Sequence, residues 1–181
     1  FAEIEGIEDA AELDESQMNA IIDLMGDPKA YIENTLKIQD KRNNLVPLVF
    51  NSAQNKLYDE YMRQKNLGQP IRIIILKARQ MGFSTAVSAL FYHASATNEN
   101  TNSAVIAHKN EASTNILEKM KLFYEESPSV LKPMRRACNA KMLLFENPTN
   151  NENTKKVNPG LRSKVIIESA VNENALRSAT V

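Results

Sequence analysis

The sequence predicts an α/β domain in which parallel strands are flanked by helices. Residues 71–76 and 103–107 are short apolar runs rich in β-branched side chains, a pattern typical of strands buried on both faces. Each run is followed by a short turn and then by a stretch with helical spacing, which favours parallel strands joined by crossover helices. The chain of 181 residues is long enough for one domain with a substantial core.

The N-terminal part is set apart by its charge. Residues 1–27 contain nine acidic side chains and no basic one. We expect residues 1–26 to form an acidic leader that is either a loosely held helical arm or partly disordered. Since the whole chain has 22 basic and 22 acidic side chains, residues 28–181 hold 22 basic and 13 acidic ones, a net charge of +9. A basic body suits a polyanionic partner such as nucleic acid, although a mildly basic domain with a solvated leader explains the same count.

Two helices are expected before the first strand. Asp27 followed by Pro28 predicts a helix that begins with a capping side chain and a proline at its first position. Residues 46–50 are expected to be extended. Asn51 then caps a second helix, with Gln54 three residues later as in a capping box.

The remaining elements alternate between helix and strand. We expect helices over 84–95 and 111–126, and strands over 103–107, 141–145 and 164–168. Residues 147–163 are rich in Asn, Thr, Lys and Pro and predict a long exposed loop. The lone Cys138 cannot form a disulfide within the chain, which favours a reducing, cytoplasmic setting. No apolar run approaches the length that a membrane helix needs.

The connection between the strand at 71–76 and the next helix carries the main functional signal. Residues 77–85 read Lys-Ala-Arg-Gln-Met-Gly-Phe-Ser-Thr. In the phosphate-binding pattern G-x-x-x-x-G-K-[ST], Gly82 aligns with the second glycine and Ser84 with the Mg²⁺-binding hydroxyl. Phe83 stands where that pattern has lysine, and Lys77 stands at the first glycine.

Two interpretations of this loop remain open from the residues. Lys77 and Arg79 are the cations available to replace the lysine missing at Phe83, so the loop can be a phosphate site with its cation moved. The alternative is an ordinary strand, turn and helix, with Gly82 in the turn and Ser84 as the helix cap.

The order of several motifs resembles one family. Residues 77–85 resemble the deviant Walker A loop of the large terminase subunits of tailed bacteriophages and prophages, the ATPases that drive viral DNA packaging. Arg-Gln before the loop glycine is frequent in that family. Further matching segments lie at 27–38, 46–54, 103–112, 131–133, 141–145 and 163–166, and the resemblance spans about residues 27 to 175.

The resemblance implies a role for each loop residue. It places nucleotide-binding residues at Gln54, Lys77, Ala78, Gln80, Met81, Gly82, Phe83, Ser84 and Thr85. It implies that Gln54 reads the adenine edge, Lys77 contacts phosphate and Ser84 ligates Mg²⁺. Arg79 would be the catalytic residue, stabilising the charge that develops on the γ-phosphate.

The resemblance also implies a domain plan. Residues 27–181 would be part of a RecA- or helicase-like P-loop ATPase domain, with the adenine-motif segment at 46–66 and the loop at 77–85. In the family order the Walker B strand, with its acidic pair, comes after this part of the chain. Glu168 is therefore expected to be a strand residue rather than the catalytic base. The nuclease domain of the family has no counterpart in these residues, and whether this chain hydrolyses ATP stays open.

Ligands and partners follow from the same resemblance. They are ATP and Mg²⁺, double-stranded DNA, the small terminase subunit, the portal of the prohead, and further copies of the chain in a ring, all within the bacterial host cytoplasm. Two alternatives stay open. One is another helicase-like P-loop ATPase that remodels nucleic acid, and the other is a catalytically incomplete fragment that binds nucleotide or DNA.

Overall fold

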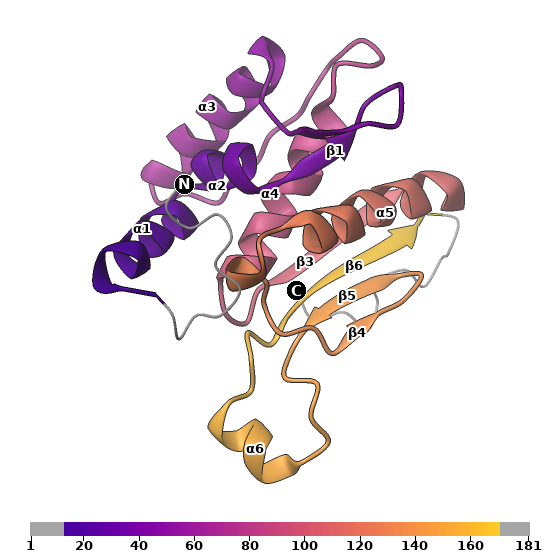
Figure 1. The fold of residues 1–181 in the computed structure, drawn as a ribbon. Helices are drawn as coiled ribbons and strands as arrows, with labels where there is room; N and C mark the ends of the chain where they lie inside the picture. The colour runs from indigo at the N-terminus through magenta and orange to yellow at the C-terminus, as the bar shows by residue number, and fades with distance from the viewer. Residues whose placement is uncertain (1–12, 171–181) are drawn as a thin grey trace.

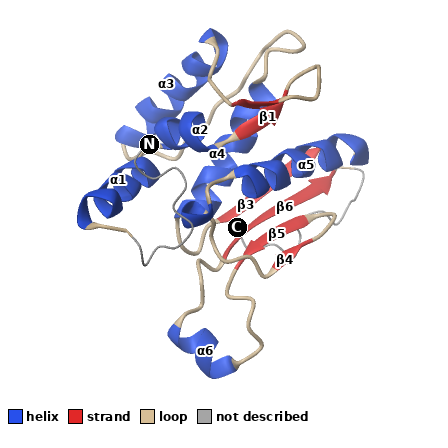
Figure 2. Cartoon of the chain, in the orientation of Figure 1, coloured by secondary structure: helices blue, strands red, loops and turns tan. Residues whose placement is uncertain are grey.

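A four-stranded mixed sheet with helices packed against it forms the centre of the fold (Figures 1 and 2). The computed structural model describes residues 13–170. The strands are β3 (Asn102–Ala107), β4 (Ala137–Cys138), β5 (Met142–Phe145) and β6 (Ser163–Ser169), in the spatial order β3-β6-β5-β4. The α/β class is thus confirmed, and the strands expected over 103–107, 141–145 and 164–168 are present.

The expectation of a wholly parallel sheet is wrong. Only β3 and β6 run parallel, whereas β5 pairs antiparallel with both β6 and β4. The reason lies in the connections. Three residues join β4 to β5, and Asn139 closes this turn by accepting the backbone N–H groups of Lys141 and Met142. So short a connection can only join antiparallel neighbours.

The helices begin where the capping residues predict. Asp27 caps α2 (Pro28–Thr35) with proline at the first position, and Asn51 forms a capping box with Gln54 at the start of α3 (Ser52–Asn66). The other helices are α4 (Phe83–Thr97), α5 (Asn110–Glu126) and α6 (Glu152–Val157). A short hairpin of β1 (Lys37–Gln39) and β2 (Leu45–Pro47) lies between α2 and α3, and a 3₁₀ turn (Ser129–Leu131) follows α5.

Two expectations need correction along the chain. Within the acidic leader, Glu15–Gly26 is a regular helix, α1, with a complete capping box at Asp14 and its Ile21 buried. The helical alternative is therefore confirmed for these residues and partial disorder is wrong for them, whereas residues 1–12 lie outside the described part. The loop expected over 147–163 contains α6, capped by Asn151, which projects from one end of the sheet (Figure 1).

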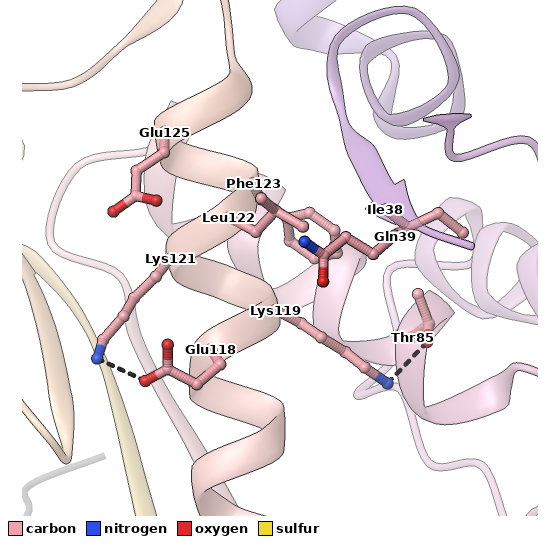
Figure 3. A pocket seen from close by; sticks show the side chains of 9 residues that line it. All are labelled: Ile38, Gln39, Thr85, Glu118, Lys119, Lys121, Leu122, Phe123 and Glu125. Atoms are coloured by element: carbon pink, nitrogen blue, oxygen red, sulfur yellow. Dashed lines mark hydrogen bonds and ion pairs between the residues drawn. The ribbon is translucent and has the colours of Figure 1, made fainter. Parts of the chain in front are cut away.

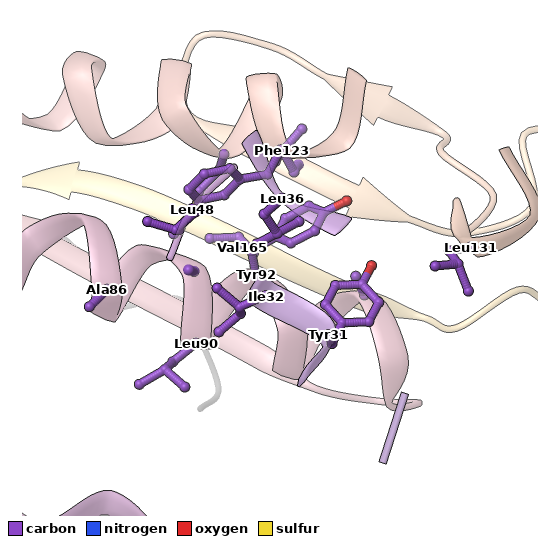
Figure 4. Close-up of a cluster of buried hydrophobic side chains, with 14 of the residues drawn as sticks. Tyr31, Ile32, Leu36, Leu48, Ala86, Leu90, Tyr92, Phe123, Leu131 and Val165 are labelled. Carbon is purple, nitrogen blue, oxygen red and sulfur yellow. The ribbon is translucent and has the colours of Figure 1, made fainter. Parts of the chain in front are cut away.

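The core lies between one face of the sheet and helices α4 and α5. Tyr92 of α4 packs edge-on against Phe123 of α5 at 5.7 Å and against Phe145 of β5 at 6.1 Å between ring centroids. Every second residue of β6, including Val165 and Ile167, is buried against these side chains (Figure 4). The same aromatic cluster therefore holds both helices to the sheet.

The apolar run at 71–76 does not form the predicted strand. Ile73 and Ile75 pack against the core, but Ile74 and Leu76 are fully exposed. The prediction that this run is buried on both faces is therefore wrong, since only alternate residues face the core. No strand among residues 13–170 lies beside the run to pair with its backbone. The run is therefore irregular despite its high β-propensity.

The second predicted strand is buried on one face only. β3 is the edge of its sheet, with β6 on one side and no described strand on the other. Ile106 and Ala107 point to opposite faces of the sheet, and Ile106 is 55% exposed whereas Ala107 is buried. The prediction of burial on both faces is therefore wrong.

Replacing the buried Phe145 tests the importance of the aromatic cluster. Phe145→Ala should lower the free energy of unfolding by about 3–5 kcal/mol, because the substitution leaves a cavity beneath Tyr92. Urea denaturation measures this. Ile74→Ala is the control, since the same kind of apolar truncation at a fully exposed position should change the stability by less than about 0.5 kcal/mol. Equal losses at the two positions would contradict this account of the core.

Candidate functional site

The loop before α4 turns sharply and delivers the chain into an uncapped helix. Gln80 and Gly82 both have left-handed backbones, with φ of 63° and 75°. Gly82 is the N-cap residue of α4, and its carbonyl accepts the N–H groups of Thr85 and Ala86 at 3.1 Å each. Ser84 is the second residue of the helix and is exposed. The alternative in which Ser84 caps α4 is therefore wrong.

The first turn of α4 receives no hydrogen bond from a capping side chain. The start of α5 likewise has no side-chain cap, whereas α1, α2, α3 and α6 are capped by Asp14, Asp27, Asn51 and Asn151. The first N–H groups of a helix need an acceptor and carry the positive end of the helix dipole. An anion at the start of α4 would satisfy both requirements.

The start of α3 holds this loop in place. Gln54 is buried, accepts the backbone N–H of Asn51 at 2.9 Å and donates through Nε2 to the carbonyl of Gly82 at 2.9 Å. Asn51 also donates to the carbonyl of Met81 at 3.4 Å. The amide of Gln54 is thus used by the fold, and the adenine contact expected from it would rest on its remaining N–H and lone pair.

The two cations expected at the loop lie at its surface. Lys77 is exposed and its amine donates to the carbonyl of the next residue, Ala78, at 3.4 Å. Arg79 and Gln80 are also exposed. Neither Lys77 nor Arg79 is ion-paired with a carboxylate of residues 13–170. Phe83, which replaces the usual lysine, is partly buried and packs against the hydrophobic core.

A third cation, Lys119 of α5, reaches the same turn. Its amine donates to the hydroxyl of Thr85 at 3.1 Å (Figure 3). Burial lowers the pKa of this amine. We did not predict Lys119 from the sequence, although a signal exists. It lies three residues after Ile116 and four before Phe123, so helical spacing places it beside the apolar face of α5.

The lysine borders a cavity of about 470 Å³ between α5, β1 and the start of α4. The side chains that line it are Ile38, Gln39, Thr85, Glu118, Lys119, Lys121, Leu122, Phe123 and Glu125 (Figure 3). The volume falls in the range of small-molecule sites.

Carboxylate ligands for a metal are not gathered at the loop. Residues 13–170 contain no group of three or more His, Cys, Asp or Glu side chains that could hold a metal ion. Glu168 lies on β6 and is ion-paired with Lys141 at 3.3 Å, as suits a strand residue. An ion such as Mg²⁺ would therefore be held here by Ser84, water and the phosphates of a nucleotide, a set of oxygen ligands that Mg²⁺ accepts.

Comparison with known proteins adds no family assignment. No model of a protein family matches the sequence, and a search of curated proteins found no match. Within residues 13–170 no helix combines the length and the apolar character needed to cross a bilayer.

The contact between Gly82 and Gln54 yields a test of the loop geometry. A Cβ added at Gly82 would lie 2.7 Å from Nε2 of Gln54, in addition to the strain of a left-handed backbone. Gly82→Ala should therefore lower the free energy of unfolding by about 2–4 kcal/mol, the sum of the backbone cost and a lost buried hydrogen bond. Urea denaturation is the measurement.

Gly68→Ala is the matched control for the backbone cost. Gly68 has φ of 65°, but nothing lies within 4 Å of its added Cβ. This substitution should cost only about 1–2 kcal/mol. In a Gln54→Ala background, Gly82→Ala should cost no more than Gly68→Ala does. If Gly82→Ala costs as much stability in the Gln54→Ala background as in the wild type, Gln54 does not position the loop.

Proposed function

We propose that this chain is the N-terminal part of the ATPase domain of a viral large terminase, which couples ATP hydrolysis to the packaging of double-stranded DNA. The observation that carries the proposal is the loop at 77–85. A left-handed Gly82 leads into the first turn of α4, which has no side-chain cap and carries the exposed Ser84 with its hydroxyl. A phosphate-binding loop needs this combination of a tight turn and a free helix start.

In this function each loop residue has a role that is compatible with its position. Backbone N–H groups of Phe83 and Ser84 would bind the phosphates, and the Ser84 hydroxyl would join the Mg²⁺ shell. Lys77 and Arg79, both exposed and without an ion pair to a described carboxylate, can swing toward the terminal phosphates. Mg²⁺ would neutralise the charge that develops on the transferred phosphoryl group.

The arrangement around 71–76 supports the RecA- or helicase-like fold that this function requires. An apolar cavity of about 370 Å³ separates Ile71, Ile73 and Ile75 from Ser103 of β3. The facing edge of β3 has no partner among the described strands. The proposal adds further parallel strands along the unpartnered edge of β3, including the one with the acidic Walker B pair. Pairing with them would convert 71–76 into a regular strand.

The proposal further assigns double-stranded DNA as the polymer that the ATPase moves. The net charge of +9 on residues 28–181 supports a polyanionic partner. The small terminase subunit, the portal and a ring of further copies belong to the same proposal through the resemblance alone.

Calorimetric titration with Mg²⁺·ADP tests nucleotide binding. The 181-residue chain should bind in the micromolar range, and Lys77→Ala should weaken binding about tenfold, or 1.4 kcal/mol. Lys156→Ala is the control, because it removes an exposed lysine from α6, which projects from the far end of the sheet (Figure 1), and should leave the affinity within twofold.

Absence of binding to the wild-type chain would contradict the proposal for these residues. Binding that Lys77→Ala and Lys156→Ala weaken equally would contradict the role of Lys77. Binding without ATP turnover in a longer chain that includes the acidic strand would favour the alternative of a nucleotide-binding module that is not an enzyme.

DNA binding should be weak, independent of sequence and sensitive to salt. We expect the affinity for a labelled duplex to fall at least tenfold between 50 and 200 mM salt, because each neutralised phosphate releases a counterion. Fluorescence anisotropy measures this. An affinity that does not change with salt, or no binding at 50 mM, would remove DNA as the partner of this part of the chain.

A further inference from the structure

Lys119 is a half-buried cation without a carboxylate partner among the described residues. The ion pairs within residues 13–170 do not include it, and its one hydrogen bond to a side chain goes to the neutral hydroxyl of Thr85. Its neighbour Lys121 differs, since it is ion-paired with Glu118 at 2.7 Å. Burying an ammonium group without a countercharge costs free energy, which an anion bound beside it would recover.

The anion that would bind beside Lys119 can be inferred from the position of this lysine relative to the loop. Thr85 is the third residue of α4, so the amine lies within about one helical turn of the uncapped N–H groups. Phe83 packs on the other side, lining a hollow with Ile75 and with Leu57 of α3. The loop therefore lacks a cation at Phe83 but has one close to the same turn, provided by a different helix.

The cavity beside Lys119 leaves room for a ligand. In Figure 3 Lys119 extends toward Thr85, while Glu118 and Lys121 extend to the other side of α5. The carboxylate of Glu118 is thus turned away from Lys119 and engaged by Lys121.

We propose that Lys119 supplies from α5 the cation that Phe83 replaces in the loop, and that its amine binds a phosphate group of the nucleotide at the start of α4. This inference rests on the nucleotide-binding function proposed above and adds a residue to that site. In the absence of nucleotide, the hydroxyl of Thr85 holds the amine. On binding, phosphate oxygens replace or join this hydroxyl as acceptors, and a neutral hydrogen bond gives way to a stronger charge-assisted pair.

The test compares two lysines on the same helix. Lys119→Met keeps the apolar stem and removes the charge, and Lys121→Met is the matched control. In calorimetric titrations of the 181-residue chain with Mg²⁺·ADP, we expect Lys119→Met to weaken binding about tenfold, which corresponds to 1.4 kcal/mol. Lys121→Met should stay within twofold of the wild type. Lys119→Arg, which retains a cation, should lose less than Lys119→Met.

Thermal unfolding with and without Mg²⁺·ADP separates this role from a structural one. Lys119→Met should leave the Tm of the ligand-free chain unchanged or raise it, because it removes an unpaired, half-buried charge. It should reduce the increase in Tm that Mg²⁺·ADP produces in the wild type. A residue that only supports packing would show the reverse, with a lower ligand-free Tm and an unchanged increase.

The outcomes distinguish the two proposals. If the wild type and both Met variants bind Mg²⁺·ADP equally, Lys119 has no role in binding and the proposed function stands. If Lys119→Arg loses as much as Lys119→Met, the charge is not what matters and the inference is wrong. If the wild-type chain binds no Mg²⁺·ADP, both proposals fall together.

Discussion

The geometry of the candidate site depends on one buried amide. Gln54 bonds to the backbone of Asn51 on one side and to the carbonyl of Gly82 on the other, so it joins the start of α3 to the start of α4. Gly82 has to be glycine for two reasons, its left-handed backbone and the 2.7 Å that a Cβ would leave to Nε2 of Gln54. The contact with Gln54 directs the carbonyl of Gly82 toward α3. Because glycine, the N-cap residue, has no side chain, the first N–H groups of α4 have no side-chain cap.

Packing in the core places α5 beside the first turn of α4, on the side away from α3. Tyr92 contacts Phe123 and Phe145 at once, so α4 and α5 cannot shift independently on the sheet. Phe123 lies one turn along α5 from Lys119, and the contact that fixes the ring also brings the amine to Thr85. Local chain geometry thus forms the loop, whereas tertiary packing supplies its third cation.

The parts of the fold that could be predicted from the sequence are those that depend on local chemistry. Asp27 and Asn51 fix helix starts by accepting hydrogen bonds from residues two or three positions away, and Pro28 does so through its fixed φ, so their effect is visible in the chain itself. The run at 71–76 has the composition of a strand, but a strand also needs a neighbour, which no local pattern reveals. The antiparallel pairing of β5 and the meeting of Lys119 with Thr85 depend on contacts between distant segments, and were missed for the same reason.

The exposure of Ile74 and Leu76 has a consequence for the behaviour of the chain in solution. Residues 71–76 read Ile-Arg-Ile-Ile-Ile-Leu, an apolar, β-branched run without proline, which is the composition of segments that start amyloid-like stacking. Arg72 is the single charge within the run, and Gln64 binds its backbone on both the N–H and the carbonyl. Arg72 therefore occupies the place of a gatekeeper, a charge within an apolar run that opposes stacking of the exposed segment with other chains.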